Sequence, residues 1–458
     1  MSRIRYFTAL WLSKLTFVIL KLAGKNATMF PGRVALKICP DFLSQTKKCP
    51  CLICVTGTNG KTTTTNIIAD VLTCAGFKVV SNRYGSNINT GVAAALTHSV
   101  GVFGKPRVDF CVLEVDERFS RLILPFIKPD FLVVTNLFRD SLKRNAHPEY
   151  IFGILDTFVP KSTKLILNAD CLQSSRLLKD NKRVFFGIDK LKGDVKECVN
   201  LINDFSFCPV CFTKLKYEYL RYHHIGKAYC PSCGFCSYDA DCRIISTDLK
   251  NKTMTVLRNG KTAQFPVIND ALFNIYNELA AITLLYEVGI SEKTVNEALL
   301  KTEITETRYS ETQFKGVSLI RTMAKGQNSV AASRAFDFVG SKKEERSVFI
   351  MLDDIYERKD SSEFIGWIYD ADFEFLIKPE IKQIILAGPR CLDYKLRLLI
   401  AGADEKKLLC DIDEFSAVER MDKSVKAVYL LHDTSTLDLA LQVEKRIIRA
   451  FGGDFNEN

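Results

Sequence analysis

One nine-residue stretch constrains the fold of this chain more than any other feature. Residues 55–63 read VTGTNGKTT. They begin at the end of an apolar run at residues 52–56 and open a helical pattern that continues to residue 72. A strand, a glycine turn and a helix in that order are typical of a phosphate-binding loop, because backbone N–H groups and the helix N-terminus then face the phosphate oxygens. The sequence therefore predicts a nucleotide-binding site here. A glycine turn that only caps a helix is the alternative.

The side chains of this loop have the chemistry that a nucleoside triphosphate and its cation require. Lys61 would neutralise charge on the β- and γ-phosphates, and the hydroxyl of Thr62 would bind Mg²⁺. The general pattern has a glycine where this chain has Val55, and Gly57 takes its place, so the loop is a variant. The predicted ATP-binding residues of the loop are Gly57, Thr58, Asn59, Gly60, Lys61, Thr62 and Thr63.

Acidic residues stand at the end of the predicted strand at residues 110–115. Open α/β sheets place their ligands at the carboxyl ends of the strands, and a carboxylate there can complete a Mg²⁺ shell. We predict Glu114 as the Mg²⁺ ligand, with Asp116 and Glu117 near the substrate or in the outer shell. The alternative is a strand end whose carboxylates are only solvated.

Four of the sixteen cysteines form two C-x₂-C pairs that are separated by eighteen residues. This spacing is typical of a tetrahedral Zn²⁺ site, and four thiolates leave no open position for water, so the site would be structural. The predicted zinc ligands are Cys208, Cys211, Cys230 and Cys233. No small-residue cleavage site follows the apolar N-terminal stretch, so we expect the thiols to be in a reducing cytosol.

Strands alternate with helical patterns over most of the chain, which predicts an α/β fold with parallel sheets. The alternation is broken by a cysteine- and tyrosine-rich insertion at about residues 205–238 and returns in the last third. The length of 458 residues suggests about three domains. We expect an N-terminal helical segment at residues 1–45, a central ATP-binding domain at 46–312 that carries a zinc ribbon, and a Rossmann-like domain at 313–458.

The N-terminal segment and the net charge indicate what kinds of partner the protein could bind. Residues 10–22 are largely apolar, but Lys14 and Lys21 interrupt them, and a spanning helix needs about 20 apolar residues. The segment is either a helix packed on the protein or one that rests against a membrane face. The formal charge of +10 favours an anionic partner, which could be a phosphate-bearing substrate, a nucleic acid or an acidic lipid surface.

The combination of motifs resembles the Mur ligase family, whose members form amide bonds on peptidoglycan precursors through an acyl-phosphate. Residues 57–62, GTNGKT, have the spelling of the family's ATP loop, and Glu114, Thr135 and Asn136 follow in the family's order. Residues 274–281, NIYNELAA, look like the adenine-contacting helix start and supply Asn274 and Asn277. Arg308 resembles the arginine that joins the nucleotide site near the domain hinge.

Within that family the chain is similar to the MurT branch, the ligase-like subunits of lipid II isoglutaminyl synthases. The four-cysteine insertion, residues 9–15 and 31–37, and the LFRD spelling at 137–140 carry this resemblance. It implies ATP- and Mg²⁺-dependent amidation of the α-carboxylate of D-glutamate in the lipid II stem peptide. Ammonia would come from a GatD-type glutaminase subunit, at the cytoplasmic face of the bacterial membrane, and no nucleic acid would be needed.

The resemblance also implies a catalytic set of Lys61, Glu114 and Asp360. In the family, an aspartate of the C-terminal domain is thought to complete the catalytic triad of the glutaminase. Asp360 is the best match, and Asp353 and Asp354 are rivals, because this third of the chain departs from the family spelling.

Three other interpretations stay open on the sequence. One is a ligase similar to folylpolyglutamate synthetase that joins an amino acid to a soluble acid. Another is a P-loop ATPase whose zinc ribbon binds nucleic acid through basic and aromatic residues such as Lys216 and Tyr217. The last is a MurT-like subunit that no longer couples to a glutaminase.

Overall fold

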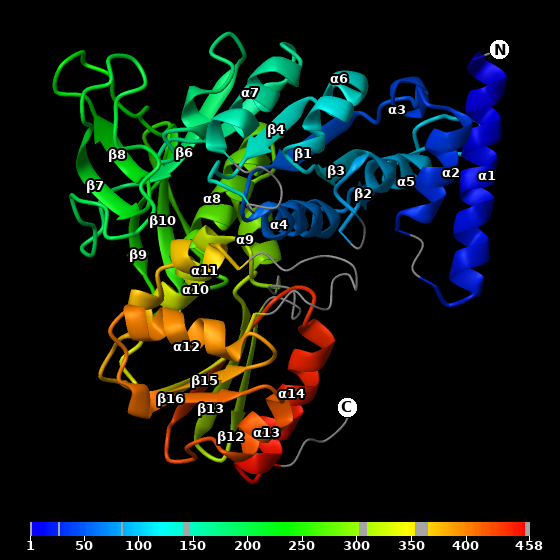
Figure 1. Ribbon diagram of the computed structural model, residues 1–458. Helices are drawn as coiled ribbons and strands as arrows, with labels where there is room; N and C mark the ends of the chain where they lie inside the picture. Colours follow the sequence, from blue (N-terminus) through cyan, green and yellow to red (C-terminus); the bar gives the residue numbers. More distant parts are fainter. Residues whose placement is uncertain are drawn as a thin grey trace. The chain divides into compact units, whose positions relative to one another are not determined.

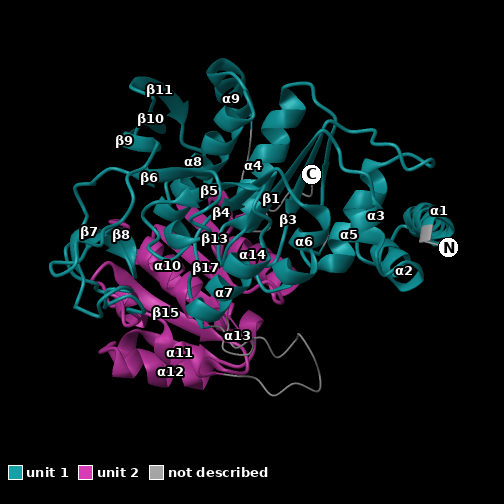
Figure 2. Ribbon diagram, turned by 90° about the horizontal axis from the view of Figure 1, so that it is seen from above, with its two compact units in different colours: residues 1–138, 147–199, 203–302 teal, residues 139–146, 200–202, 303–458 magenta. Residues whose placement is uncertain are grey.

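The computed structural model describes residues 2–25, 28–83, 86–140, 147–301, 309–352 and 365–453. The chain forms two compact units, which Figure 2 colours separately. Unit 1 comprises residues 1–138, 147–199 and 203–302, and unit 2 comprises residues 139–146, 200–202 and 303–458.

Unit 1 is built on a nine-stranded sheet with the order β11-β10-β9-β6-β5-β4-β1-β3-β2 (Figure 1). The six strands from β1 to β6 run parallel to their neighbours; they are β1 (Cys51–Thr56), β2 (Val79–Ser81), β3 (Phe110–Glu114), β4 (Phe131–Val134), β5 (Lys164–Asn168) and β6 (Arg183–Ile188). Five of the six residues of β1 are buried, because helices cover both faces of such a sheet and its central strands read as continuous apolar runs.

The helices of unit 1 include three long ones that flank the nucleotide loop and the sheet. These are α4 (Lys61–Cys74), α5 (Asn89–Ser99) and α8 (Leu272–Glu287). The others are α6 (Leu124–Ile127), α7 (Pro148–Phe158), α9 (Glu292–Leu299) and the short 3₁₀ turns η1 (Phe119–Leu122) and η3 (Ser174–Arg176). The parallel α/β arrangement expected from the strand–helix alternation is confirmed for this part of the chain.

Three antiparallel strands extend the sheet and were not predicted from the sequence. They are β9 (Cys242–Asp248), β10 (Thr253–Arg258) and β11 (Lys261–Pro266), and β9 pairs in parallel with β6. The sheet is therefore mixed. The missed signal is Asn259-Gly260, whose φ angles of 50° and 74° form the tight turn between β10 and β11 that Asn-Gly favours.

The N-terminal helices belong to unit 1. They are α1 (Ser2–Leu22), α2 (Phe30–Ile38) and α3 (Phe42–Gln45). Tyr6, Ala9 and Leu10 of α1 are buried in the same apolar core as Leu52 of β1 and Leu113 of β3. No helix among the described residues is both long enough and apolar enough to cross a bilayer.

The insertion contains a two-stranded antiparallel hairpin of β7 (Lys216–Tyr222) and β8 (Ile225–Tyr229). Leu172, Phe205, Leu215 and Leu220 form a small separate core beneath it, together with Cys208 and Cys230. The insertion thus has its own packing and does not extend the main sheet.

Unit 2 has a six-stranded sheet with the order β12-β13-β17-β14-β15-β16, which is parallel except for β12. The strands are β12 (Tyr309–Phe314), β13 (Val317–Met323), β14 (Arg346–Met351), β15 (Ile381–Ala387), β16 (Leu408–Asp411) and β17 (Ala427–His432). The helical elements are α10 (Ser329–Gly340), α11 (Trp367–Asp370), η4 (Phe373–Leu376), α12 (Cys391–Ile400), η5 (Glu405–Lys407), α13 (Glu414–Glu419) and α14 (Leu437–Ala450). Alternate residues of β14 point to opposite faces, and two apolar cores lie on the two faces, so the expected α/β arrangement of this region is confirmed.

Candidate active site and cysteine cluster

The loop between β1 and α4 has a conformation that requires glycine at two positions. Gly57 and Gly60 have φ angles of 128° and 87°, which L side chains rarely adopt. A Cβ at Gly57 would lie 2.3 Å from the Thr135 hydroxyl oxygen, and one at Gly60 would lie 2.0 Å from Oδ1 of Asn277. The loop therefore closes against the end of β4 on one side and against α8 on the other.

Residues at the end of β4 hold the loop by its backbone. Oδ1 of Asn136 accepts a hydrogen bond from the Asn59 N–H at 3.1 Å, and the Asn136 amide donates back to the Asn59 carbonyl at 3.0 Å. The Thr135 hydroxyl donates to the same carbonyl at 2.6 Å. Asn59 is thereby fixed, which gives a physical reason for finding Thr135 and Asn136 together with this loop.

Lys61 is the first residue of α4, and its ammonium group lies inside the loop. Nζ donates to the carbonyls of Gly57 and Thr58 at 2.5 and 3.2 Å and to the Glu117 carboxylate at 2.9 Å. Burial lowers the pKa of Lys61, but the carboxylates of Glu117, Glu114 and Asp116 outweigh it, so the pKa is raised. Lys61 thus keeps a positive charge where a phosphate would lie.

The two predicted Mg²⁺ ligands lie next to each other. The Thr62 hydroxyl donates to Oε2 of Glu114 at 2.7 Å, and the Asn87 amide donates to the other carboxylate oxygen at 2.9 Å. Asn82 fixes the Glu114 backbone through bonds of 2.8 Å to its N–H and 2.9 Å to its carbonyl. Two hard oxygen donors at the mouth of a phosphate loop form a donor set that fits Mg²⁺.

Sequence reasoning missed part of this arrangement. It placed Glu117 near the substrate or in the outer shell, whereas Glu117 forms a buried ion pair with Lys61. It did not name Asn82 and Asn87. Their signal was available, since both lie in the polar segment after β2, whose carboxyl end adjoins that of β3 in the parallel sheet.

The predicted adenine-contacting residues lie against the loop. Asn277 is buried, its amide donates to Oδ1 of Asn274 at 3.4 Å, and its carbonyl accepts a hydrogen bond from the Thr64 hydroxyl of α4 at 3.3 Å. The start of α8 therefore packs directly against the phosphate loop. The other predicted residues, Arg308 and Asp360 with its rivals Asp353 and Asp354, lie outside the described residues.

The carboxyl of Glu278, the next residue of α8, should make the stability of unit 1 depend on pH. Burial raises its pKa to about 8, and Oε1 has no hydrogen-bond partner among the described residues. Below pH about 4.5 the carboxyl is protonated in both the folded and the unfolded chain. Between pH about 5 and 8 only the unfolded chain ionises, so the free energy of unfolding falls as the pH rises. Replacing Glu278 by glutamine should remove this loss and stabilise unit 1 at pH 8 relative to pH 5, by on the order of a few kcal/mol.

The measurement is urea unfolding followed by the fluorescence of Trp11 in a Trp367→Phe background, because Trp11 lies in unit 1. Glu287→Gln is the matched control on the same helix. Burial raises the pKa of Glu287, but its bonds to Lys164 and Arg258 lower the pKa by more, so the net shift is downward. The effect of Glu287→Gln on the free energy of unfolding should therefore be constant between pH 5 and 8. A constant effect of Glu278→Gln across this range would contradict the prediction.

The four predicted zinc ligands come together. Their sulfur atoms all lie within 4.8 Å of one another, and Sγ–Sγ distances of 3.6 Å (Cys208 to Cys233) and 3.5 Å (Cys211 to Cys230) are present without a disulfide. Tetrahedral zinc with Zn–S bonds of about 2.3 Å separates its sulfurs by about 3.8 Å. The donor set and its spacing therefore fit zinc.

The two C-x₂-C pairs have the same local geometry. The Val210 N–H donates to the sulfur of Cys208 at 3.4 Å, and the Ser232 N–H donates to the sulfur of Cys230 at 3.5 Å. The residues that follow the second cysteine of each pair, Phe212 and Gly234, both have left-handed φ angles, 60° and 73°. N–H groups that point at sulfur favour the thiolate form, which is the form that binds metal.

His224 lies elsewhere, although it stands between the two cysteine pairs in the sequence. It is buried, with Nε2 3.3 Å from the sulfur of Cys171 and its ring 4.6 and 4.5 Å from the ring centroids of Phe138 and Phe205. In the part of the chain that the structure describes, the four cysteines are the only cluster of three or more histidine, cysteine or acidic side chains close enough together to hold a metal ion.

A buried polar network connects the insertion to the nucleotide-site helix. Arg221 of β7 donates to the carboxylate of Asp170 at 2.8 Å and to the Tyr276 hydroxyl at 2.5 Å, and it pairs with Asp194 at 3.2 Å. The Tyr276 hydroxyl donates to Asp170 at 2.5 Å. Tyr276 precedes Asn277, so the hairpin that carries the cysteine cluster is anchored next to the loop.

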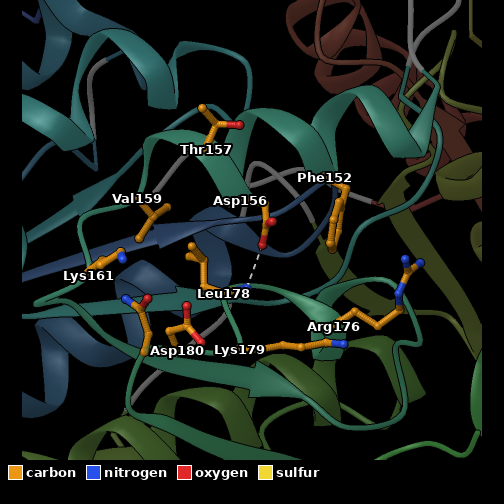
Figure 3. A pocket seen from close by; sticks show the side chains of 10 residues that line it. Phe152, Asp156, Thr157, Val159, Lys161, Arg176, Leu178, Lys179 and Asp180 are labelled. Atoms are coloured by element: carbon orange, nitrogen blue, oxygen red, sulfur yellow. Dashed lines mark hydrogen bonds between the residues drawn. The ribbon is translucent and has the colours of Figure 1, made fainter.

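A hollow of about 460 Å³ lies elsewhere on unit 1, between α7 and residues 176–181 (Figure 3). Lysine, arginine and aspartate side chains line it together, and the Asp156 carboxylate accepts a hydrogen bond from the Leu178 N–H at 2.7 Å. None of the predicted site residues is among those that line it. Its mixed charge gives no reason to place the phosphate-bearing substrate there.

The chain matches known protein families both in its nucleotide-binding part and in its C-terminal part. Residues 55–230 match the Mur ligase middle domain, and residues 326–437 match the MurT ligase C-terminal domain. The chain is 30% identical over 447 residues to the MurT subunit of the glutamine-hydrolyzing lipid II isoglutaminyl synthase of Staphylococcus aureus (strain COL), covering 96% of this chain and 98% of that protein. The corresponding subunit of Streptococcus pneumoniae (strain ATCC BAA-255 / R6) is 30% identical over 416 residues, covering 90% and 89%.

Solved structures show the same fold. A pseudomurein peptide ligase type C from Methanothermus fervidus superposes with a TM-score of 0.67 at 20% identity, covering 89% of this chain and 81% of that one. MurF from Acinetobacter baumannii superposes with a TM-score of 0.63 at 12% identity, covering 91% and 80%. The expected Mur ligase fold is thus present, and the chain belongs to the MurT branch of the Mur ligase family of ATP-dependent ligases.

Proposed function

We propose that this protein amidates the α-carboxylate of D-glutamate in the stem peptide of lipid II, forming D-isoglutamine during peptidoglycan biosynthesis. The observation that carries the proposal is the 30% identity to MurT subunits over 96% of the chain. The clustering of Lys61, Thr62 and Glu114 at one phosphate loop supports it.

The proposed reaction proceeds through an acyl-phosphate, because a carboxylate is a poor electrophile and needs a leaving group. A carboxylate oxygen attacks the γ-phosphorus of ATP and ADP leaves. Ammonia then attacks the acyl carbon, phosphate departs, and the nitrogen loses a proton to solvent. Lys61, fixed by Gly57 and Glu117, is placed to offset the negative charge of the transferred phosphoryl group.

The remaining residues of the site would bind and orient the nucleotide. Thr62 and Glu114 would hold Mg²⁺, which when bound neutralises charge on the phosphates. The backbone of residues 57–63 would cradle the phosphates, and Asn274 and Asn277 would contact adenine, joined by Arg308. The four cysteines would hold a structural zinc, since four thiolates leave no position for substrate or water.

Ammonia is proposed to come from a partner subunit. The relatives from Staphylococcus aureus and Streptococcus pneumoniae are named as one subunit of a glutamine-hydrolyzing synthase, which implies a second subunit. We infer that a GatD-type glutaminase fills this role and that Asp360, or one of Asp353 and Asp354, completes its catalytic triad. Since lipid II is membrane-anchored, the complex would work at the cytoplasmic face of the membrane.

The test supplies lipid II, ATP and Mg²⁺ and identifies the product by mass spectrometry. Nitrogen is given either as glutamine with the co-expressed glutaminase or as ammonium alone. A product lighter by the difference between a hydroxyl and an amino group, formed only with ATP, is the expected result. Asp360→Asn should abolish the reaction with glutamine and retain it with ammonium.

Other outcomes identify the competing functions. Amidation of lipid II with ammonium but never with glutamine would mean that coupling to the glutaminase has been lost. If neither nitrogen source supports amidation and amino acids are joined to a soluble acid instead, the proposal is wrong.

A further inference from the structure

One face of α1 is anchored in the protein. Tyr6, Ala9, Leu10 and Ser13 are buried, and this side of the helix contacts α2 and α5. The Ser13 hydroxyl donates to the Pro31 carbonyl at 2.9 Å, which fixes the helix against α2. The orientation of α1 in unit 1 is therefore determined by packing.

The opposite face of α1 is apolar and exposed. Its exposed fractions range from 42% at Leu12 to 84% at Leu22; the residues are Ile4, Trp11, Leu12, Leu15, Val18, Ile19 and Leu22. At about 100° per residue they fall within an arc of about 120°, diametrically opposite the buried face, and the exposed Thr8 is the one polar side chain within this arc. The seven apolar side chains keep between 42% and 84% of their surface exposed, and Figure 1 shows α2 and α5 on one side of α1 only.

A neighbouring loop continues this apolar face. The indole N–H of Trp11 donates to the Val102 carbonyl at 2.8 Å, so residues 102–103 lie beside the helix. Val102 and Phe103 are 53% and 78% exposed. We call these two residues and the seven exposed apolar residues of α1 the α1 surface. A continuous apolar surface of this kind marks an interaction site.

All charged residues in the first forty positions of the chain, which include α1, are basic. Residues 2–40 contain no Asp or Glu and seven basic residues: Arg3, Arg5, Lys14, Lys21, Lys25, Arg33 and Lys37. By their helical positions, Arg5 lies along one edge of the apolar arc, and Arg3 and Lys21 lie along the other, all three exposed. Lys14 is different, because its Nζ donates to the carbonyls of Thr97 and Val100 within the fold.

We propose that the α1 surface docks on an anionic lipid bilayer, with the helix lying in the plane of the interface. An apolar arc with basic residues at both edges is typical of interfacial helices, whose apolar side chains enter the acyl boundary while lysine and arginine meet the phosphates. Trp11 is an aromatic side chain of the kind that is enriched in the headgroup region, and Phe103 adds apolar area to the face that would enter the acyl boundary. Charge complementarity therefore selects an anionic membrane over a protein groove.

This inference rests on the proposed function for its biological role, since a lipid-anchored substrate must be met at a membrane. Docking through α1 would deliver unit 1, with its phosphate loop, to the layer that holds the substrate. The binding itself is measurable without any turnover. The two proposals can therefore fail separately.

The test is co-flotation of the full chain with vesicles of phosphatidylcholine alone or mixed with phosphatidylglycerol. The parent protein should bind the mixed vesicles, and binding should weaken as salt rises. Leu15→Glu with Val18→Glu should reduce binding at least about tenfold, as should Arg3→Gln with Lys21→Gln, because each basic residue near the surface contributes to attraction. Leu396→Glu with Ile400→Glu is the matched control, since these exposed apolar residues lie on α12 of unit 2.

The readouts separate the possible failures. All variants should retain the parent's melting temperature and amidate detergent-solubilised lipid II as the parent does. On vesicle-embedded lipid II only the α1 variants should lose activity, and the α12 control should match the parent. A parent that amidates lipid II but does not float with anionic vesicles overturns the docking proposal alone. Vesicle binding without amidation overturns the proposed function alone. If the Leu15 and Val18 substitutions disrupt a complex with the glutaminase or a second copy, and the parent binds no vesicles, the α1 surface is a protein interface.

Discussion

Replacing Lys61 by alanine should reduce kcat/KM for lipid II amidation by about 10³-fold, the effect typical of removing a charge that stabilises a transition state. The ammonium group of Lys61 lies inside the loop and is held by two carbonyls and the Glu117 carboxylate. The measurement is product formation by mass spectrometry under saturating ATP. Lys48→Ala is the matched control, because Lys48 is an exposed lysine that pairs with Asp130, and it should leave the rate unchanged.

A double substitution distinguishes chemistry from folding. Lys61→Ala alone breaks the ion pair with the Glu117 carboxylate, which is 2% exposed, and breaking a buried pair in this way costs roughly 3–5 kcal/mol. Lys61→Ala with Glu117→Gln also removes the buried carboxylate charge and should recover most of that stability. Activity should stay low in the double variant. If activity returned together with stability, Lys61 would serve only to pair with Glu117.

Replacing Cys230 by serine should abolish stoichiometric zinc binding and lower the melting temperature of unit 1 by roughly 10 °C, since a bound structural metal contributes directly to folding free energy. Cys230 is buried in the small core of the insertion, and its sulfur lies 3.5 Å from that of Cys211. Zinc content by mass spectrometry of protein purified without chelator, and thermal unfolding, are the measurements. The parent should hold one zinc per chain.

The matched control for Cys230→Ser is Cys236→Ser. Cys236 is exposed, lies near the second cysteine pair in sequence and is not part of the four-sulfur group. It should keep both the zinc and the melting temperature of the parent. A parent with well below one zinc per chain would contradict the zinc proposal, and equal effects of the two substitutions would contradict the assigned ligand set.

The fold was predictable where sequence patterns report local conformation. The apolar run before the loop became β1, and the strand–helix alternation expected in the last third is present as β14, β15 and β17 with the helices between them. The strands β9 to β11 were missed because they are only partly buried and form no continuous apolar run, and because the Asn259-Gly260 turn was not used. Propensity is weak for such strands, since pairing with neighbours supplies much of their stability.

The candidate site divides in the same way. The positions of Gly57 and Gly60 follow from a loop that needs left-handed backbone, and the C-x₂-C spacing follows from tight turns that point two sulfurs at one metal. The pairing of Lys61 with Glu117 was not predictable, because both Glu114 and Glu117 were eligible carboxylates, and only the path of the chain after β3 selects between them.

The sequence by itself determined the features that a few neighbouring residues encode: the phosphate loop, the two cysteine pairs, the α/β alternation and the positive charge of the first forty residues. Only the tertiary structure decided which distant groups meet. It placed Asn277 against Gly60, directed His224 to Cys171 and away from the cysteine cluster, and left one apolar face of α1 exposed while burying the other. The physical reason is that turns and helix periodicity are set by local sterics, whereas these contacts depend on how the sheet stacks segments that lie far apart along the chain.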